Sequence, residues 1–269
     1  MKMKPPIRLV ALDLDGTLLR SDKTISQRTL QTIQTARDQG VVVAIATGRM
    51  YSTARAYGRI LGLGDMPMVL YAGGLIQTVE SGKKLYEKAI SVEDAKAVLA
   101  IAKEKGWQMQ TYIDDVLRTA VSDHWIQEYE RKTGAHAVIC GDDAYQPQGS
   151  CNKILSRSTH EELLQRKAYI DQQLPGKLQV LFSEDTYLEI MPTGVNKGTG
   201  LQRLADLYGV SIEETMAVGD SQNDIDMLKV VGVSVTMENA HDEIKKVADH
   251  VTASNDEDGV AQAIEKVVL

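Results

Sequence analysis

The chain has 269 residues, 43% of them hydrophobic and 25% charged, so it is long enough for one large domain or two modest ones with a sizeable apolar core. Its formal net charge of −7 disfavours nucleic acid and anionic membranes as partners, because both select basic surfaces. No apolar run approaches the ~20 residues of a membrane span, and the first residues do not resemble a signal peptide. We therefore expect a cytoplasmic protein, either a monomer or a small homo-oligomer.

The first predicted element is a short apolar strand within residues 7–14 that runs into two carboxylates, Asp13 and Asp15. Side chains alternate along a strand, so both acids are expected on one side, with Gly16 letting the chain turn away sharply. Ligands of open α/β sheets bind at the carboxyl ends of the strands. The pair by itself is a short motif, and one acid capping a turn beside a solvated one remains an open interpretation at this point.

Predicted helices and strands alternate after this strand, in the order helix 26–40, strand 41–46, helix 52–61 and strand 68–71. Strand–helix–strand order predicts parallel βαβ units. Thr47 and Gly48 follow the second strand, so we expect them at the same edge of the sheet as Asp13.

The pattern changes from about residue 77. A separate α+β unit is predicted there, with helices over 92–105 and 161–173 and strand-like runs over 108–113, 153–156, 178–182 and 186–190. Alternation returns with a helix over 198–208 and a strand over 216–218. We therefore predict an α/β fold with a Rossmann-like parallel-sheet core, residues 1–82 and 192–269, and an inserted α+β cap, residues 83–191.

The cysteines and histidines carry no recognisable site. Cys140 and Cys151 have neither CxxC spacing nor a small secreted chain around them, so we expect ordinary thiols. The five histidines form no pair with metal-ligand spacing. A bound metal is therefore expected to have oxygen ligands.

Four chemically distinctive sites stand at the ends of the predicted elements, namely DLDGT at 13–17, TGR at 47–49, Lys197 and GDSQND at 219–224. Each alone has an ordinary explanation as a helix cap, a surface lysine or a solvated turn. In this order they resemble the four motifs of the haloacid dehalogenase-like superfamily. The short first gap and long second gap resemble its Cof-type branch, which carries a large α+β cap.

Two further runs, GVNKG at 194–198 and SNDEDGV at 254–260, are similar to bacterial sugar-phosphate phosphatases of that branch. One run departs from the family pattern. Such proteins usually carry Asn-Gly-Ala after the third core strand, whereas this chain has Ala-Gly-Gly at 72–74. Any polar role of that asparagine is therefore absent or replaced.

The resemblance implies a role for each matched residue. Asp13 would be the nucleophile and Asp15 the general acid and base. The residues implied to bind phosphate or substrate are Thr47, Gly48, Lys197 and Asn223. Mg²⁺ would be held by the carboxylates of Asp13 and Asp220 and the backbone carbonyl of Asp15, with Asp224 orienting metal waters or Lys197 from outside the ligand set.

The activity implied is that of a Mg²⁺-dependent phosphatase that hydrolyses small phosphorylated metabolites, with sugar phosphates expected, through an aspartyl-phosphate intermediate. A phosphohexomutase is disfavoured, because sugar phosphomutases place their cap between the first two motifs. A non-catalytic sugar-phosphate-binding regulator is the other alternative, although both aspartates and Lys197 are present. Four charged cap residues, Arg118, His124, Lys153 and Arg157, are weak candidates for substrate contacts, because isolated charges are usually solvated. Hinges are expected near Gly82 and Pro192.

Overall fold

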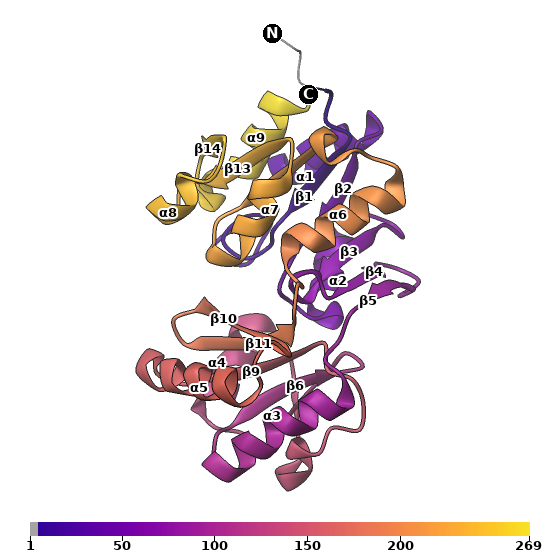
Figure 1. Ribbon diagram of the computed structural model, residues 1–269. Coiled ribbons are helices and arrows are strands. Elements are labelled where there is room, and N and C mark those ends of the chain that lie inside the picture. Colours follow the sequence, from indigo (N-terminus) through magenta and orange to yellow (C-terminus); the bar gives the residue numbers. More distant parts are fainter. Residues whose placement is uncertain (1–4) are drawn as a thin grey trace. The chain divides into compact units, whose positions relative to one another are not determined.

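The computed structural model describes residues 5–269, which form two compact units (Figure 1). Unit 1 consists of the residues up to Gly48 together with Ala54–Tyr86 and Asn196–Leu269, and unit 2 of Arg49–Thr53 and Glu87–Val195. The chain passes between the units after residues 48, 53, 86 and 195; the boundaries predicted from the sequence are at 82 and 192. The first four residues, on which the expectation about a signal peptide partly rests, lie outside the described part.

Unit 1 is built on a five-stranded parallel sheet. Its strands, in spatial order, are β14 (His250–Thr252), β13 (Val233–Met237), β12 (Thr215–Gly219), β1 (Leu9–Leu12) and β2 (Val42–Ile45). A smaller sheet holds β3 (Pro67–Leu70), β4 (Leu75–Thr78) and β5 (Lys84–Glu87). A single parallel bridge between Ala46 and Val69 continues the main sheet onto β3.

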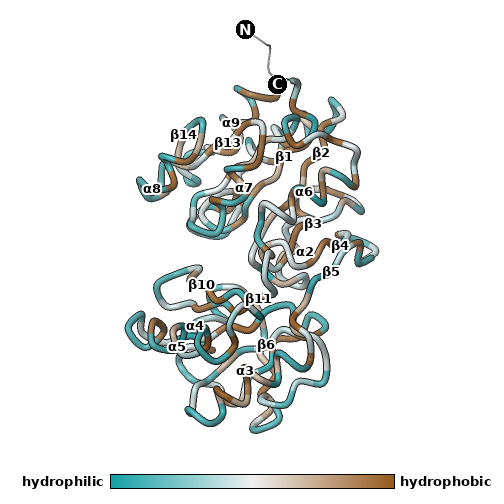
Figure 2. Tube along the Cα trace, viewed as in Figure 1, coloured by the Kyte–Doolittle hydropathy of each residue, from teal (hydrophilic) through white to brown (hydrophobic). Residues whose placement is uncertain are grey.

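The helices of unit 1 are α1 (Gln27–Asp38), α2 (Tyr51–Ile60), α6 (Lys197–Tyr208), α7 (Ile225–Val230), α8 (Asp242–Lys245) and α9 (Gly259–Val267); the first three residues of α2 fall in unit 2. Alternate β1 residues Leu9 and Ala11 pack in one core with Leu204 of α6 and Met227 of α7. In Figure 2 the apolar stretches follow the strands and the loops are largely polar. Burial of both sheet faces explains why β1 is a continuous apolar run.

Unit 2 is an α+β unit with one six-stranded sheet, antiparallel except for its last pair. In spatial order its strands are β10 (Leu178–Glu184), β11 (Tyr187–Pro192), β9 (Lys153–Arg157), β6 (Met109–Ile113), β7 (Val116–Thr119) and β8 (Ala137–Ile139). Its complete helices are α3 (Val92–Lys105), α4 (His124–Thr133) and α5 (His160–Gln173). Apolar residues of α3 and α5 share a core with β6, β9 and β11.

The predicted fold class is confirmed by the parallel sheet of unit 1 and the separate mixed sheet of unit 2. Helix α3 coincides with its predicted range, and α6 begins one residue earlier than predicted, at Lys197. Helix α4 and strands β7 and β8 were not predicted from the sequence. Within residues 5–269, no helix is both long and apolar enough to cross a membrane.

The four charged residues considered in unit 2 behave differently from one another. Arg118 and His124 are exposed, as isolated charges usually are. Lys153 and Arg157 are buried instead, so the expectation that they are solvated is wrong for these two. Each has a partner that offsets its burial, because Lys153 pairs with Glu189 at 2.8 Å and the Arg157 guanidinium stacks 4.4 Å from the Tyr187 ring centre.

Both cysteines are free thiols, as predicted. Cys140 is partly exposed, whereas Cys151 is fully buried in the core of unit 2. Burial raises the pKa of the Cys151 thiol to about 12. The buried cysteine is therefore an unreactive packing residue.

Candidate active site

Three neighbouring strands of unit 1 end at one edge of the parallel sheet. Leu12, the last residue of β1, pairs with Val218 of β12 on one side and with Ile45 of β2 on the other. The pairing continues one residue further, because the Asp13 N–H donates to the Val218 carbonyl at 3.0 Å. Asp13 therefore lies between the ends of β12 and β2.

The ammonium group of Lys197 bridges two carboxylates at this edge. Its Nζ lies 2.6 Å from Oδ1 of Asp13 and 2.7 Å from Oδ1 of Asp224. The exposed fraction of the side chain is 1% for Lys197, 6% for Asp13 and 0% for Asp224. A lysine buried this deeply is stable only when its charge is paired, so these contacts hold Asp13 in one place.

Lys197 reaches the carboxylates because α6 begins at this residue. Asn196 caps the helix, since its Oδ1 accepts from the Thr199 N–H at 2.8 Å and its own N–H donates to Thr199 Oγ1 at 3.2 Å. A cation at a helix N-terminus is repelled by the helix dipole. The two carboxylates offset that repulsion as well as the burial of the charge.

Two glycines let α6 approach the 3₁₀ turn after β3, which is η1 (Tyr71–Gly73). A Cβ on Gly73 would lie 2.1 Å from the Asn196 carbonyl oxygen, and one on Gly200 would lie 2.7 Å from the Gly73 Cα. The run at 72–74 that departs from the family pattern therefore keeps a glycine where the helix requires one.

Asp220 follows β12 and is held by the turn after β1. Thr17 Oγ1 donates to Asp220 Oδ1 at 2.6 Å. Gly16 has a φ of 80°, and a Cβ there would come within 2.4 Å of Asp220 Oδ2. Gly16 thus allows the sharp turn expected from the sequence and also leaves room for the Asp220 carboxylate.

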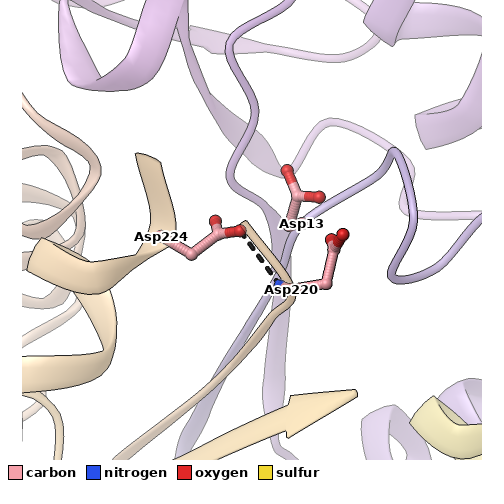
Figure 3. Close-up of side chains that lie close together, drawn as sticks. All are labelled: Asp13, Asp220 and Asp224. Carbon is pink, nitrogen blue, oxygen red and sulfur yellow. Dashed lines mark hydrogen bonds between the residues drawn. The ribbon is translucent and has the colours of Figure 1, made fainter. Parts of the chain in front are cut away.

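Asp224 organises the segment between β12 and α7. Its Oδ2 accepts from the Asp220 N–H at 3.1 Å, drawn as a dashed line in Figure 3, and from the Ser221 N–H at 3.0 Å. Its Oδ1 accepts from Lys197. Both oxygens of Asp224 are therefore engaged by donors of the protein.

Carboxylate oxygens of Asp13, Asp220 and Asp224 lie within 4.8 Å of one another (Figure 3). Together with the ammonium of Lys197, these three carboxylates leave a formal excess of two negative charges. A divalent cation would neutralise this excess, and an all-oxygen donor set suits Mg²⁺ better than softer metals. The residues present therefore fit a magnesium ion.

The pKa values of the cluster reflect burial first and the neighbouring charges second. Burial raises the pKa of Asp13 well above its ordinary value, although Lys197 opposes the shift. Burial, followed by the nearby Asp224, raises the pKa of Asp220 to about 6. Burial acts to lower the pKa of Lys197, but Asp13 and Asp224 outweigh it and raise that pKa, so the ammonium stays charged.

Thr47, Gly48 and Asn223 lie around the same edge. Thr47 is buried and lies two residues after the end of β2, with its N–H donating to the Val69 carbonyl at 2.9 Å. A Cβ on Gly48 would lie 4.0 Å from Nδ2 of Asn223. The segments after β2 and β12 are therefore close neighbours.

Asp15 stands apart from the carboxylate cluster. Its side chain is 39% exposed, and its Oδ1 lies 3.0 Å from Nζ of Lys23. The metal contact expected for Asp15 uses its backbone carbonyl, so the position of the side chain does not bear on that expectation. The Asp15 carboxylate is thus partly exposed, although it lies one residue beyond the buried Leu14.

Two contacts of these aspartates were not predicted. Thr17 lies within the first motif, and its position two residues after Asp15 is the only indication in the sequence of its contact with Asp220. Lys23 has no such indication, because it returns to Asp15 through a turn in which its own φ is 65°.

Comparison with known proteins gives a consistent result. The family model of the haloacid dehalogenase-like hydrolases matches residues 10–264. The chain is 32% identical to the 5-amino-6-(5-phospho-D-ribitylamino)uracil phosphatase YitU of Bacillus subtilis, over 99% of this chain and 98% of that one. It is 30% identical to an HMP-PP phosphatase of Yersinia pseudotuberculosis, over 89% and 86% of the respective chains.

A solved structure has the same fold along nearly the whole chain. It is a haloacid dehalogenase-like hydrolase from Bacteroides thetaiotaomicron, 31% identical, with a TM-score of 0.90 over 97% of this chain and 99% of that one. The match therefore extends over both units. The chain therefore belongs to the haloacid dehalogenase-like hydrolase family, in its Cof-type branch.

Proposed function

We propose that this phosphatase hydrolyses small phosphorylated metabolites, sugar phosphates among them, with Mg²⁺ and through an aspartyl-phosphate intermediate. The observation that carries the proposal is the buried contact of 2.6 Å between Lys197 Nζ and Asp13 Oδ1. An ammonium held there fixes the nucleophile and offsets the charge of an incoming phosphoryl group.

In the first half of the reaction, a carboxylate oxygen of Asp13 attacks phosphorus. The bond between phosphorus and the ester oxygen breaks as the new bond forms, giving an acyl phosphate on Asp13. Asp15 donates its proton to the departing alkoxide, which leaves as an alcohol. Asp15 regains a proton in the second half of the reaction, so one turnover leaves its protonation state unchanged.

In the second half, Asp15 acts as the base. It takes a proton from a water molecule whose oxygen attacks phosphorus, and the acyl phosphate bond breaks. Inorganic phosphate leaves and the carboxylate of Asp13 is regenerated. The phosphoryl oxygens and the substrate would be bound in both halves by four residues. They are Thr47 and Gly48 after β2, Lys197 at the start of α6, and Asn223 in the segment after β12.

Asp13 and Asp220 would hold Mg²⁺ with the backbone carbonyl of Asp15, and Asp224 would keep Asp220 and Lys197 oriented. When bound, the ion neutralises charge on the phosphoryl oxygens and helps to align them with the nucleophile. The formal excess of negative charge in the cluster supports this assignment, because an anionic substrate would otherwise be repelled.

The names of two relatives support small polar phosphates as substrates. They describe a phosphatase of a phospho-ribitylamino compound and a phosphatase of HMP-PP. The chain covers almost the full length of the first of these proteins, so both units have a counterpart in it.

The test is phosphate release from a panel of sugar phosphates, nucleotides and pyridoxal phosphate, with Mg²⁺ and with EDTA. We expect release that needs Mg²⁺ and that falls at least about 10³-fold in Asp13→Asn. The matched control is Asp38→Asn on the exposed end of α1, where Asp38 accepts a surface bond from Gln34, and it should keep wild-type activity.

Activity that survives both EDTA and Asp13→Asn would contradict the proposal. A folded wild-type protein that binds sugar phosphates without hydrolysing any member of the panel would favour the binding regulator instead.

A further inference from the structure

Two asparagines hold the turn that carries Asp15. Asn239 Nδ2 donates to the Gly16 carbonyl at 2.8 Å, and Asn255 Nδ2 donates to the Leu19 carbonyl at 2.8 Å. The two are also joined, because the Asn255 N–H donates to Asn239 Oδ1 at 3.0 Å. We call Asn239 and Asn255 the asparagine clamp.

The chemistry of the clamp requires amides. Asn239 must offer a donor to Gly16 and an acceptor to Asn255 at the same time, so its amide has one workable orientation. A carboxylate would place an oxygen against the Gly16 carbonyl.

A second set of contacts joins the same two segments. Arg20 Nη2 donates to Asp258 Oδ1 at 2.7 Å, and Asp256 accepts from the Ser21 N–H at 2.9 Å and from its hydroxyl at 2.6 Å. The acceptors belong to the run at 254–260, which has no part in the proposed reaction. The run therefore contacts three consecutive residues of the segment after β1, namely Leu19, Arg20 and Ser21.

The turn that the asparagine clamp holds comes directly after the two catalytic aspartates. The Leu18 N–H donates to the Asp13 carbonyl at 3.2 Å, and the Leu19 N–H to the Leu14 carbonyl at 2.8 Å. Asp15 lies within both of the loops that these two bonds close, and it directly precedes Gly16. Moving the Gly16 carbonyl therefore moves the backbone of Asp15.

We propose that Asn239 and Asn255 are positioning residues that hold Asp15 where it can protonate the leaving group; this rests on the proposed function. Neither side chain is fully buried, so each hydrogen bond contributes only modestly to stability. Positioning is more sensitive, because a shift of ~1 Å in a catalytic group can cost on the order of 10²-fold in rate.

The test compares two leaving groups in Asn239→Ala and Asn255→Ala. The substrates are 4-nitrophenyl phosphate and whichever of ribose 5-phosphate, glucose 6-phosphate and glycerol 1-phosphate the wild type cleaves fastest. An acidic phenol leaves without help from a general acid, whereas an alcohol needs a proton. We expect kcat/KM to fall about 10- to 100-fold for the alkyl phosphate and only a few-fold for the aryl phosphate.

The control is Gln77→Ala, which removes a bond of the same kind, from a side-chain amide to the Gly82 carbonyl at 2.7 Å, elsewhere in unit 1. It should leave the ratio of the two kcat/KM values unchanged. Thermal melting checks each variant, and Asn239→Ala decides the matter if Asn255→Ala does not fold, because Asn239 is the more exposed of the two.

Equal losses for the two substrates, or no loss, would overturn the positioning role. Failure of the proposed function looks different, because the wild type would then release phosphate from no alkyl phosphate.

Discussion

At the scale of single residues, the site consists of charges that burial disfavours unless they are paired. Lys197 is charged because Asp13 and Asp224 surround it, whereas no cation among residues 5–269 forms a salt bridge with Asp220. Its one side-chain donor among the contacts described is the Thr17 hydroxyl at 2.6 Å. The ionisation of Asp220 therefore depends on Thr17 and on any bound cation.

The pKa of about 6 for Asp220 leads to a pH-dependent prediction. A folded-state pKa above the ordinary value means that burial disfavours the carboxylate. The metal-free protein therefore loses stability as the pH rises from the ordinary pKa of an aspartate to about 6. Mg²⁺ binds the ionised form, so its stabilising effect should grow over the same range. We expect the difference in Tm between Mg²⁺ and EDTA to be larger at about pH 7.5 than at about pH 5.

Thr17→Val removes the hydroxyl donor at nearly constant volume. The pKa of Asp220 should rise further, so the onset of stabilisation by Mg²⁺ should move to higher pH than in the wild type. Thr24→Val is the control, because the Thr24 hydroxyl bonds to Asp22 on the surface. A difference in Tm that is independent of pH in the wild type would contradict this account of Asp220.

At the scale of elements, the contact between α6 and η1 decides where Lys197 lies. Gly200→Ala would place a Cβ 2.6 Å from Val69 Cγ1 and 2.7 Å from the Gly73 Cα, so the start of α6 must shift. We expect a loss of about 1 to 3 kcal/mol in unfolding free energy and a clear fall in kcat.

Gly209→Ala at the other end of α6 is the matched control. Gly209 has a φ of 61° with open space around it, so alanine there is strained by about 1 to 2 kcal/mol without touching the start of the helix. Urea unfolding and kcat measured on both variants separate the two effects. Equal kcat values at similar stability would show that the contact at η1 does not set the position of Lys197.

Part of unit 1 could be predicted from the sequence, because β1 and β2 are almost fully buried and Ser26 caps α1. β1 and β2 read as continuous apolar runs, and Ser26 and Gly40 marked the limits of α1. The meeting of Asp13 with Lys197 needed the order of motifs as well, since 184 residues separate them. No local pattern encodes such a contact.

Other features could not be predicted because tertiary contacts decide them. Helix α4 is short and polar on most of its surface, with only Ile126 and Tyr129 buried. Lys153 and Arg157 read as solvated charges, and their burial comes from the pairing of β9 with β11 and from the contacts of Arg157 with α4. The asparagine clamp likewise joins Gly16 to Asn239 across 223 positions.

At the scale of the whole molecule, an acidic chain hydrolyses an anionic substrate only if positive charge is concentrated where the substrate binds. The net charge is −7, and the carboxylate cluster is itself negative. Lys197 and a divalent cation would supply that charge at the nucleophile. The proposed reaction therefore requires Asp13 to form a covalent bond to phosphorus.

Trapping that bond is the most direct measurement. The wild type with Mg²⁺ would be mixed with a cleaved sugar phosphate, quenched in acid within the first turnovers, reduced with borohydride and digested for mass spectrometry. An acyl phosphate is reduced to an alcohol, whereas a free carboxylate is not, so we expect the reduced side chain at position 13 and at no other aspartate. An unmodified Asp13 in protein that is turning over, or reduction at a different carboxylate, would contradict the mechanism.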